Sequence, residues 1–173
     1  MYDYAMEHAQ KVSLFGCSRG AYFQLLAFAD AGIDCAWLLS PVTDMERIIH
    51  NLMDYCHISE EEFRERVLVE NDMEPLYFPY YEYVRKNPVT KWKHQTYILR
   101  GENDTLCEYA YVKSFADRFG CEMTVQKNGG GTGFIRKKNW TFSVTGCGKD
   151  CNSDMWAGCL RAFRQAVSEQ SVP

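Results

Sequence analysis

The sequence lacks several features that mark common classes of protein. No apolar run among its 173 residues is long enough to span a bilayer, and Met1–His8 has neither the basic start nor the apolar core of a secretory signal. Positive charge is not in excess, because 19 Lys and Arg stand against 23 Asp and Glu, for a net charge of -4. We therefore expect a cytoplasmic protein with a small-molecule partner, and neither nucleic acid nor a membrane surface as its main partner.

Signals for a metal or a disulfide framework are also missing. Five of the eight cysteines lie among apolar neighbours and are typical of reduced, small buried hydrophobes: Cys17, Cys35, Cys56, Cys107 and Cys121. Cys147, Cys151 and Cys159 lie closer together, but they form no C-x2-C pair and no histidine follows His94. A zinc site is therefore not expected, and no cofactor is predicted.

The most specific pattern that is present lies near the start of the chain. An apolar run, Val12–Phe15, leads into Gly16-Cys17-Ser18-Arg19-Gly20, after which the apolar spacing becomes helical. A strand, a sharp turn and a helix in this order predict a nucleophile elbow with Ser18 at its tip, and we expect both glycines to be needed because a side chain would collide there. The alternative is a tight strand-to-helix turn without chemistry.

The remaining pattern predicts an α/β fold with a mostly parallel sheet flanked by helices. Four strands are expected to lie parallel in one sheet: Val12–Phe15, Cys35–Leu39, Thr96–Leu99 and Met123–Gln126. Helices are expected over Tyr2–Gln10, from the elbow to about Asp30, and over Glu108–Phe119. Gly32 and Gly120 are the expected C-terminal caps of the last two.

Between the second and third strands the character of the sequence changes to helical, with no strand predicted. Met45–Met53 has helical spacing, and Ser59-Glu60-Glu61-Glu62 is a capping box. The aromatic cluster in Leu76–Val84 either packs the helices onto the sheet, which we favour, or lines an apolar substrate pocket. We expect a single domain, 1–173, with a helical, lid-like insertion over 44–93.

These motifs together resemble those of the α/β-hydrolase superfamily, and most of all its small bacterial members, over roughly Glu7–Asn128. Three segments carry the likeness, at the elbow, at the end of the next strand and at an acid-bearing turn: Phe15–Phe23, Leu39–Pro41 and Leu99–Asp104. The resemblance implies that Ser18 is a nucleophile and Asp104 the acid of a triad in the chain order Ser, Asp, His.

Two aspartates compete for the acid's role. Asp104 follows a strand, where an aspartate is otherwise most often a turn residue or a helix cap. Asp44 is the alternative acid, since it follows the strand after the elbow, but its position before Met45 also suits a simple N-cap.

The chain departs from the family pattern in two places. The family has several strands ahead of the elbow, including one whose loop supplies an oxyanion N–H, whereas one predicted helix precedes the elbow's strand here. We therefore expect a chain that lacks those strands and an exposed sheet edge, with Leu14, Cys17 and Trp37 packed against nothing. The second departure is the histidine, which belongs after the last strand, near Asn128, where a glycine-rich stretch stands instead.

None of the four histidines is an obvious substitute, although His50 and His57 on the insertion are the candidates to approach Ser18. The stretch Asn128–Gly133 lacks the Gly-Lys-Ser/Thr ending of a phosphate loop. From Gly131 to about Ser153 the chain also loses helical periodicity. In a reading frame displaced by one nucleotide this stretch can encode a histidine followed by a capped, amphipathic helix, so we predict a frame-shifted and poorly ordered tail over 129–173. A genuine tail that folds in its own way is the alternative.

Two classes of function follow. One is a serine hydrolase of the esterase type, acting on a small ester or acyl compound, in which Ser18 attacks, a histidine is the base, Asp104 orients it and the N–H of Arg19 contributes to the oxyanion hole. The other is a catalytically inactive fragment or binding module that keeps only the fold and the elbow. A nucleotide-binding Rossmann-like domain is a distant third, because no Gly-x-Gly-x-x-Gly follows a strand.

Overall fold

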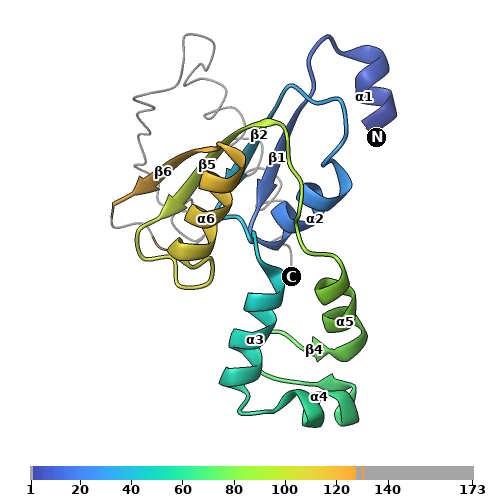
Figure 1. Ribbon diagram of the computed structural model, residues 1–173, viewed down its shortest axis with the longest axis vertical. Coiled ribbons are helices and arrows are strands. Elements are labelled where there is room, and N and C mark those ends of the chain that lie inside the picture. Colours follow the sequence, from blue (N-terminus) through green and yellow to red (C-terminus); the bar gives the residue numbers. More distant parts are fainter. Residues whose placement is uncertain (1, 128–129, 131–173) are drawn as a thin grey trace, which may run out of the picture. The chain divides into compact units, whose positions relative to one another are not determined.

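A four-stranded parallel sheet forms the centre of the computed structural model, which describes residues 2–127 and 130 (Figure 1). Its strands lie in the order β1 (Ser13–Cys17), β2 (Cys35–Leu39), β5 (Gln95–Gly101) and β6 (Glu122–Gln126). All three neighbouring pairs are parallel. The prediction of four parallel strands in one sheet is confirmed, and β1 is the terminal strand of the described sheet.

The register of the sheet brings three loops to one edge. Cys17 lies opposite Leu39, which in turn lies opposite Leu99, so the carboxyl ends of β1, β2 and β5 are level. In open parallel sheets, ligands bind outside the carboxyl ends of the strands. The elbow after β1 and the turn after β5 are therefore placed where a functional site is expected.

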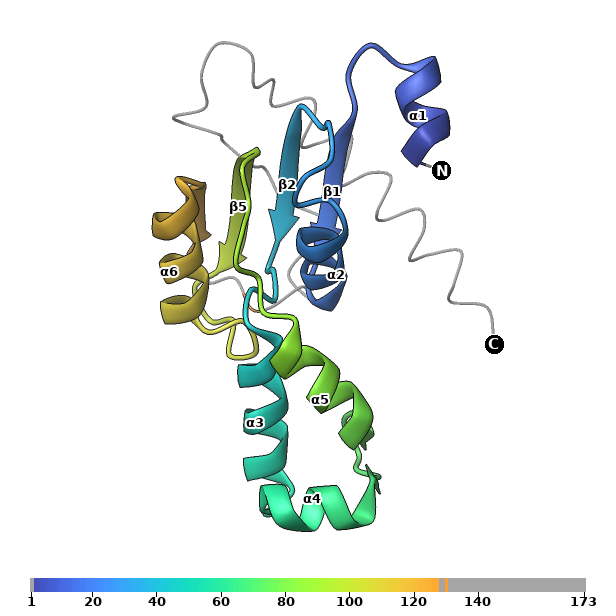
Figure 2. The same cartoon turned by 45° about the vertical axis from the view of Figure 1, so that its right-hand side comes forward.

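Helices α2 (Arg19–Ala27) and α6 (Tyr109–Phe119) pack on the same face of the sheet (Figure 2). One apolar cluster joins buried residues of both helices to buried residues of β2 and β5: Ala21, Tyr22, Leu25, Ala36, Leu38, Ile98, Val112, Phe115 and Ala116. Burial of this apolar area is the main term that holds the helices on the sheet.

The two predicted helix caps have different outcomes. Gly120 caps α6 in the left-handed conformation, with φ 66°, as predicted. Gly32 is not a cap, because α2 ends at Ala27 and Phe28 is its C-cap. Instead, the N–H of Gly32 donates to the hydroxyl of Tyr2 on α1 (Tyr2–His8), at 2.8 Å. The apolar residues after Ala27 pack as a loop, which sequence spacing does not distinguish from another helical turn.

A helical insertion joins β2 to β5 and lies beyond the carboxyl ends of β1 and β2 (Figure 2). It contains α3 (Met45–Tyr55), α4 (Glu60–Arg66) and α5 (Phe78–Lys86), and Ser59 and Glu62 form the predicted capping box. The prediction that this block has no strand is wrong. Between α4 and α5 lies an antiparallel pair, β3 (Leu68–Val69) and β4 (Leu76–Tyr77). Two residues a strand are too few to give a visible alternation in the sequence.

Three aromatic residues of the insertion pack against one another and belong to the same buried cluster as residues of the sheet. The rings of Phe63, Phe78 and Tyr81 contact one another, with centroids 5.3 Å apart for Phe63–Phe78 and 5.8 Å apart for Phe63–Tyr81. Tyr77 and Tyr83 are exposed. The ring contacts join α4 to α5, and the cluster continues from there to the sheet.

Burial at the start of the sheet differs from the expectation. Trp37, expected to pack against nothing, is 1% exposed and stacks on Tyr97 with ring centroids 4.5 Å apart, while Leu14 and Cys17 are half-buried. Trp37 lies on β2, which pairs with β1 on one side and β5 on the other, so it is not on the edge strand. Of the five described cysteines only Cys107 is buried, and the other four are half-buried. Within the described residues, no helix combines the length and the hydropathy needed to cross a bilayer.

Candidate active site

Ser18 lies at a strained turn between β1 and α2. Its φ is 50° and its ψ is -130°, in a region that residues other than glycine rarely occupy. Backbone hydrogen bonds hold it there, since its N–H donates to the carbonyl of Leu39 at 3.0 Å and its own carbonyl accepts from Ala21 and Val42, each at 3.1 Å. Although serine is a common N-cap, the hydroxyl of Ser18 makes no capping bond to α2. The fold therefore strains the backbone and leaves the hydroxyl available to a ligand.

The two glycines of the motif have unequal roles. A Cβ at Gly16 would lie 3.1 Å from the Cα of Ala21 and 3.1 Å from Cδ2 of Leu38, and would also meet the side chain of Gln24. Glycine at this position lets α2 pack closely against β1 and β2. At Gly20, by contrast, an added Cβ would meet nothing within 4 Å, so the prediction that a side chain would collide there is wrong.

Arg19 is the first residue of α2, so its backbone N–H has no acceptor within the helix. That N–H lies at the positive end of the helix dipole, directly after Ser18. The side chain of Arg19 forms an ion pair with Glu74, on the loop between β3 and β4. The loop of the insertion is thereby linked to the elbow.

Asp104 is buried in the turn after β5, where the sequence placed the acid. It is 6% exposed, and its Oδ1 accepts hydrogen bonds from the N–H groups of Leu106 at 3.2 Å and Cys107 at 3.0 Å. Its Oδ2 is buried and has no hydrogen-bond partner among the described residues. A buried carboxylate oxygen without a donor is costly, and this one is held ready to accept a hydrogen bond.

Arg100 and Cys107 support this turn, and neither was a candidate from the sequence. The guanidinium of Arg100, 2% exposed, donates to the carbonyls of Asp104 at 2.7 Å and Cys107 at 2.9 Å, and the thiol of Cys107 donates to the carbonyl of Ser40 at 3.0 Å. A charged residue at the end of an apolar strand was the signal available in the sequence. Together these bonds fix the Asp104 turn against the end of β2.

The charge of Asp104 also acts on the residue next to Ser18. Burial, and secondarily the carboxylate of Asp104, raise the pKa of the Cys17 thiol to about 11 and that of Cys107 to about 12. In addition, Leu106, whose N–H donates to Asp104, lines the same cavity as Ser18. The turn after β5 thus reaches the elbow, although the two are more than 80 residues apart in the chain.

The cavity beside Ser18 has a volume of about 280 Å³. We call it the Ser18 cavity. The elbow and the turn after β5 contribute Ser18, Arg19 and Leu106, and most of its wall comes from the insertion and the residues leading into it: Val42, Met45, Ile48, Ile49, Leu52, Phe63, Met73, Glu74, Pro75, Leu76, Tyr77 and Tyr80. The insertion therefore forms the wall of the cavity that contains Ser18, and Tyr80 is the aromatic residue of α5 that lines it.

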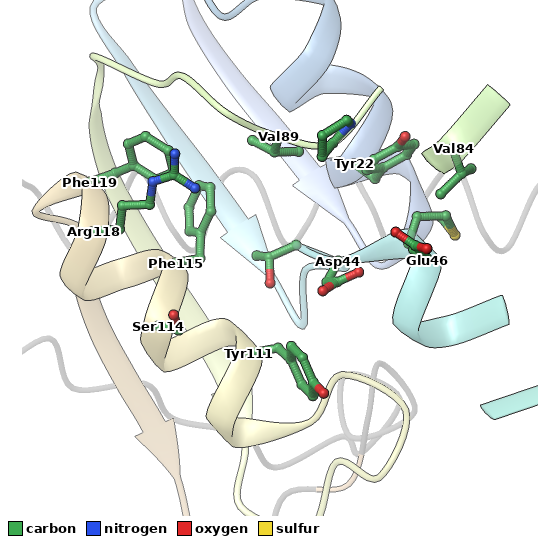
Figure 3. Close-up of a pocket in the computed structure, with 13 residues that line it drawn as sticks. Tyr22, Asp44, Glu46, Val84, Val89, Tyr111, Ser114, Phe115, Arg118 and Phe119 are labelled. Carbon is green, nitrogen blue, oxygen red and sulfur yellow. The ribbon is translucent and has the colours of Figure 1, made fainter. Parts of the chain in front are cut away.

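Asp44 lies in a different place. Its Oδ1 accepts from the N–H of Arg47 at 2.9 Å, which is the N-cap that the sequence offered as the alternative. Figure 3 shows Asp44 in a second cavity, of about 220 Å³, facing Ser114 and Phe115 of α6. Ser18 is not among the residues that line this second cavity. Asp44 is thus a helix N-cap, whereas the turn that carries Asp104 contributes Leu106 to the Ser18 cavity.

None of the four histidines lines the Ser18 cavity. His50 forms a hydrogen bond with the hydroxyl of Tyr81 at 2.8 Å, and His57 is exposed. His94 is bonded to the carbonyl of Phe28 at 3.0 Å, and His8 stacks on Tyr4. The structure thus does not bring His50 or His57 to Ser18. The glycine-rich stretch and the tail, apart from Gly130, lie outside the described residues, so the frame-shift hypothesis stays a prediction.

Comparison with known proteins gives a fold. No protein-family model and no curated protein matches the sequence. Among solved structures, the chain is similar to Est1E from Butyrivibrio proteoclasticus, with a TM-score of 0.64 at 16% identity over 95% of this chain and 65% of that chain. It is similar to the mouse alpha/beta hydrolase domain-containing protein 10, with a TM-score of 0.61 at 12% identity over 96% of this chain and 66% of that one.

A third similar structure is an esterase from Pyrococcus furiosus, with a TM-score of 0.54 at 17% identity over 78% of this chain and 52% of that chain. The chain thus spans between about half and two thirds of the length of these structures. At such identities the likeness concerns the fold. It agrees with the parallel sheet flanked by helices: this chain has the α/β-hydrolase fold, as the resemblance in its sequence implied.

Proposed function

We propose that this chain is a serine hydrolase of the esterase type, or the part of one that carries its nucleophile and acid. Ser18 is the nucleophile, Asp104 the acid and the N–H of Arg19 one donor of the oxyanion hole. The observation that carries the proposal is the pairing of a strained serine with a buried carboxylate at one sheet edge. The hydroxyl of Ser18 makes no capping bond to α2, and Oδ2 of Asp104 has no hydrogen-bond donor among the described residues.

The chemistry follows from these positions. The hydroxyl oxygen of Ser18 attacks the carbonyl carbon of an ester, its proton passes to a base, and the carbonyl oxygen becomes an oxyanion. The N–H of Arg19, at the positive end of α2, donates to that oxyanion. The alcohol then leaves, and water releases the acyl group from Ser18 by the same steps in reverse order.

Asp104 serves the base in this scheme. A buried carboxylate whose free oxygen accepts an N–H from an imidazole holds the ring in the tautomer that takes the serine proton. We assign no base among the described residues, because none of the four histidines lines the Ser18 cavity. The chain as it stands is therefore expected to be a slow hydrolase that retains the contributions of binding and of the oxyanion hole.

The small-molecule partner is proposed to be an ester or related acyl compound. Two of the structures with this fold are described as an esterase and an alpha/beta hydrolase domain-containing protein, and Est1E has been solved with ferulic acid bound. The apolar wall of the Ser18 cavity suits the acyl part of such a compound.

A fluorophosphonate probe, which forms a covalent bond to an activated serine, tests the proposal. We expect slow labelling of the full chain that Ser18→Ala abolishes and Asp104→Asn weakens. Ser114→Ala, a change to an exposed serine outside the Ser18 cavity, is the matched control and leaves labelling unchanged. Folded protein that takes up no probe supports the alternative, an inactive fragment or binding module that keeps the fold.

A further inference from the structure

The Ser18 cavity has a polar end and an apolar end. Ser18, Arg19 and Glu74 belong to the polar end, and Arg19 forms its ion pair with Glu74 there. The hydroxyl of Tyr80 also lies near Arg19, whose positive charge lowers the pKa of Tyr80 while burial, the larger effect, raises it. That hydroxyl is buried and has no hydrogen-bond partner among the described residues. The polar atoms of the cavity are therefore gathered beside the serine.

The apolar end is formed by side chains of the insertion and of the chain leading into α3. Four of them are almost fully buried, with exposed fractions of 3% for Met45, 4% for Ile49, 0% for Phe63 and 4% for Leu76. Three other lining residues, Met73, Tyr77 and Leu106, are more than half exposed. The buried set marks the deep end of the cavity and the exposed set marks its mouth.

Phe63 limits the depth. It lines the cavity from α4, is fully buried, and its ring contacts those of Phe78 and Tyr81. A ring packed against two others cannot move away from a longer ligand without disrupting that packing. The cavity therefore has a closed inner end.

From this shape we infer that the Ser18 cavity binds a straight-chain, saturated acyl group of roughly six to ten carbons, with its carboxyl head at Ser18 and its chain directed toward Phe63. The length follows from the volume. About 280 Å³ is the liquid volume of roughly nine water molecules, and a methylene group is close to a water molecule in size. The wall favours a flexible chain over a planar ring, because it consists mainly of methionine, leucine, isoleucine and valine side chains.

This inference rests on the proposed function for the direction in which the ligand lies, since it places the carboxyl carbon at the proposed nucleophile. It does not require an activated serine, so it is tested by binding. The probes are straight-chain carboxylic acids from butanoate to dodecanoate, with cinnamate as the rigid aromatic comparison. Binding to the full chain is measured by titration calorimetry.

We expect affinity to rise about fourfold for each added methylene group up to about octanoate, and to level off or fall beyond decanoate, where the chain meets Phe63. Cinnamate is expected to bind more weakly than octanoate. Affinity that does not change with chain length would overturn the inference, and so would tighter binding of cinnamate.

Variants locate the site. Leu52→Trp narrows the cavity and is expected to shift the preferred chain to a shorter one, whereas Leu26→Trp changes an equally half-buried leucine on α2 that does not line it. Phe63→Leu is expected to shift the preference to a longer chain. Equal effects of both tryptophan variants would place binding elsewhere. Length-dependent binding without labelling of Ser18 supports this inference and contradicts the proposed function, and labelling without length dependence does the reverse.

Discussion

The sheet edge and the helical insertion both contribute to the Ser18 cavity, but they do so by different means. At the sheet edge the backbone determines the geometry: backbone hydrogen bonds to the carbonyl of Leu39 and from the N–H groups of Ala21 and Val42 hold Ser18 in its strained conformation. In the insertion side chains determine it, because the wall consists of residues whose helices are held together by ring contacts such as Phe63–Phe78. The backbone of the sheet edge therefore fixes the position of the proposed nucleophile, and the side chains of the insertion determine the shape of the cavity.

The largest expected effect concerns the chemistry of the sheet edge. Restoring the displaced reading frame after Gly130 supplies a histidine, and with any upstream strands it should raise hydrolysis of nitrophenyl esters by roughly three orders of magnitude. Ser18→Ala should abolish the gain. Turnover by the unaltered chain that is already fast, and that depends on Ser18, would contradict this and make His50 and His57 the first residues to test as the base.

The next effect separates the stabilities of the two regions. Phe63→Ala removes a fully buried ring from the insertion and should cost about 3–5 kcal/mol of local stability. We expect amide hydrogens of α4 and α5 to lose protection from exchange while those of β2 and β5 keep it. Phe23→Ala, at a ring that is 44% exposed on α2, is the control and should change stability by less than about 0.5 kcal/mol. Equal loss of protection in the sheet would mean that the two regions unfold together.

A smaller effect tests the unequal glycines of the elbow. Gly16→Ala places a Cβ 3.1 Å from the backbone of Ala21 and should destabilise the fold by about 1–3 kcal/mol. Gly20→Ala meets no atom within 4 Å, lies inside α2, and should be neutral or stabilising by up to about 1 kcal/mol. Urea denaturation of both variants measures the difference. Similar losses at the two positions would show that the elbow needs both glycines.

A separate effect is the dependence of stability on pH at the sheet edge. Burial raises the pKa of Cys17 and Cys107 from 9.0 to about 11 and about 12, so the unfolded chain loses these protons at lower pH than the folded chain does. Their contribution leaves stability unchanged below about pH 9 and lowers it as pH rises toward 11 to 12, by at most about 1.4 kcal/mol per pH unit for each thiol. Denaturation from about pH 8 to pH 11 should show this slope, and Cys107→Ala should flatten it. An unchanged slope in that variant would assign it to other groups.

The sequence by itself determined the elements that depend on local pattern. The apolar runs predicted the four strands. The capping box at Ser59 and the C-cap at Gly120 were predicted from the polar and glycine residues at those positions. Each of these predictions depends on neighbouring residues in the chain. Ser18 and Asp104, which the family resemblance implied as nucleophile and acid, lie in the turns that follow β1 and β5. The short pair β3 and β4 and the end of α2 were missed, because two-residue strands and apolar loops leave no periodicity to detect.

Tertiary structure alone decided which of these residues meet. The position of the Asp104 turn against the end of β2 depends on the register that places β5 beside β2 and on the loop bonds of Arg100, none of which has a local signature. The free space at Gly20, the ion pair of Arg19 with Glu74 and the wall of the Ser18 cavity likewise join segments far apart in the chain. Contacts of this kind depend on side-chain volume and on packing between elements, which the order of residues along one element does not encode.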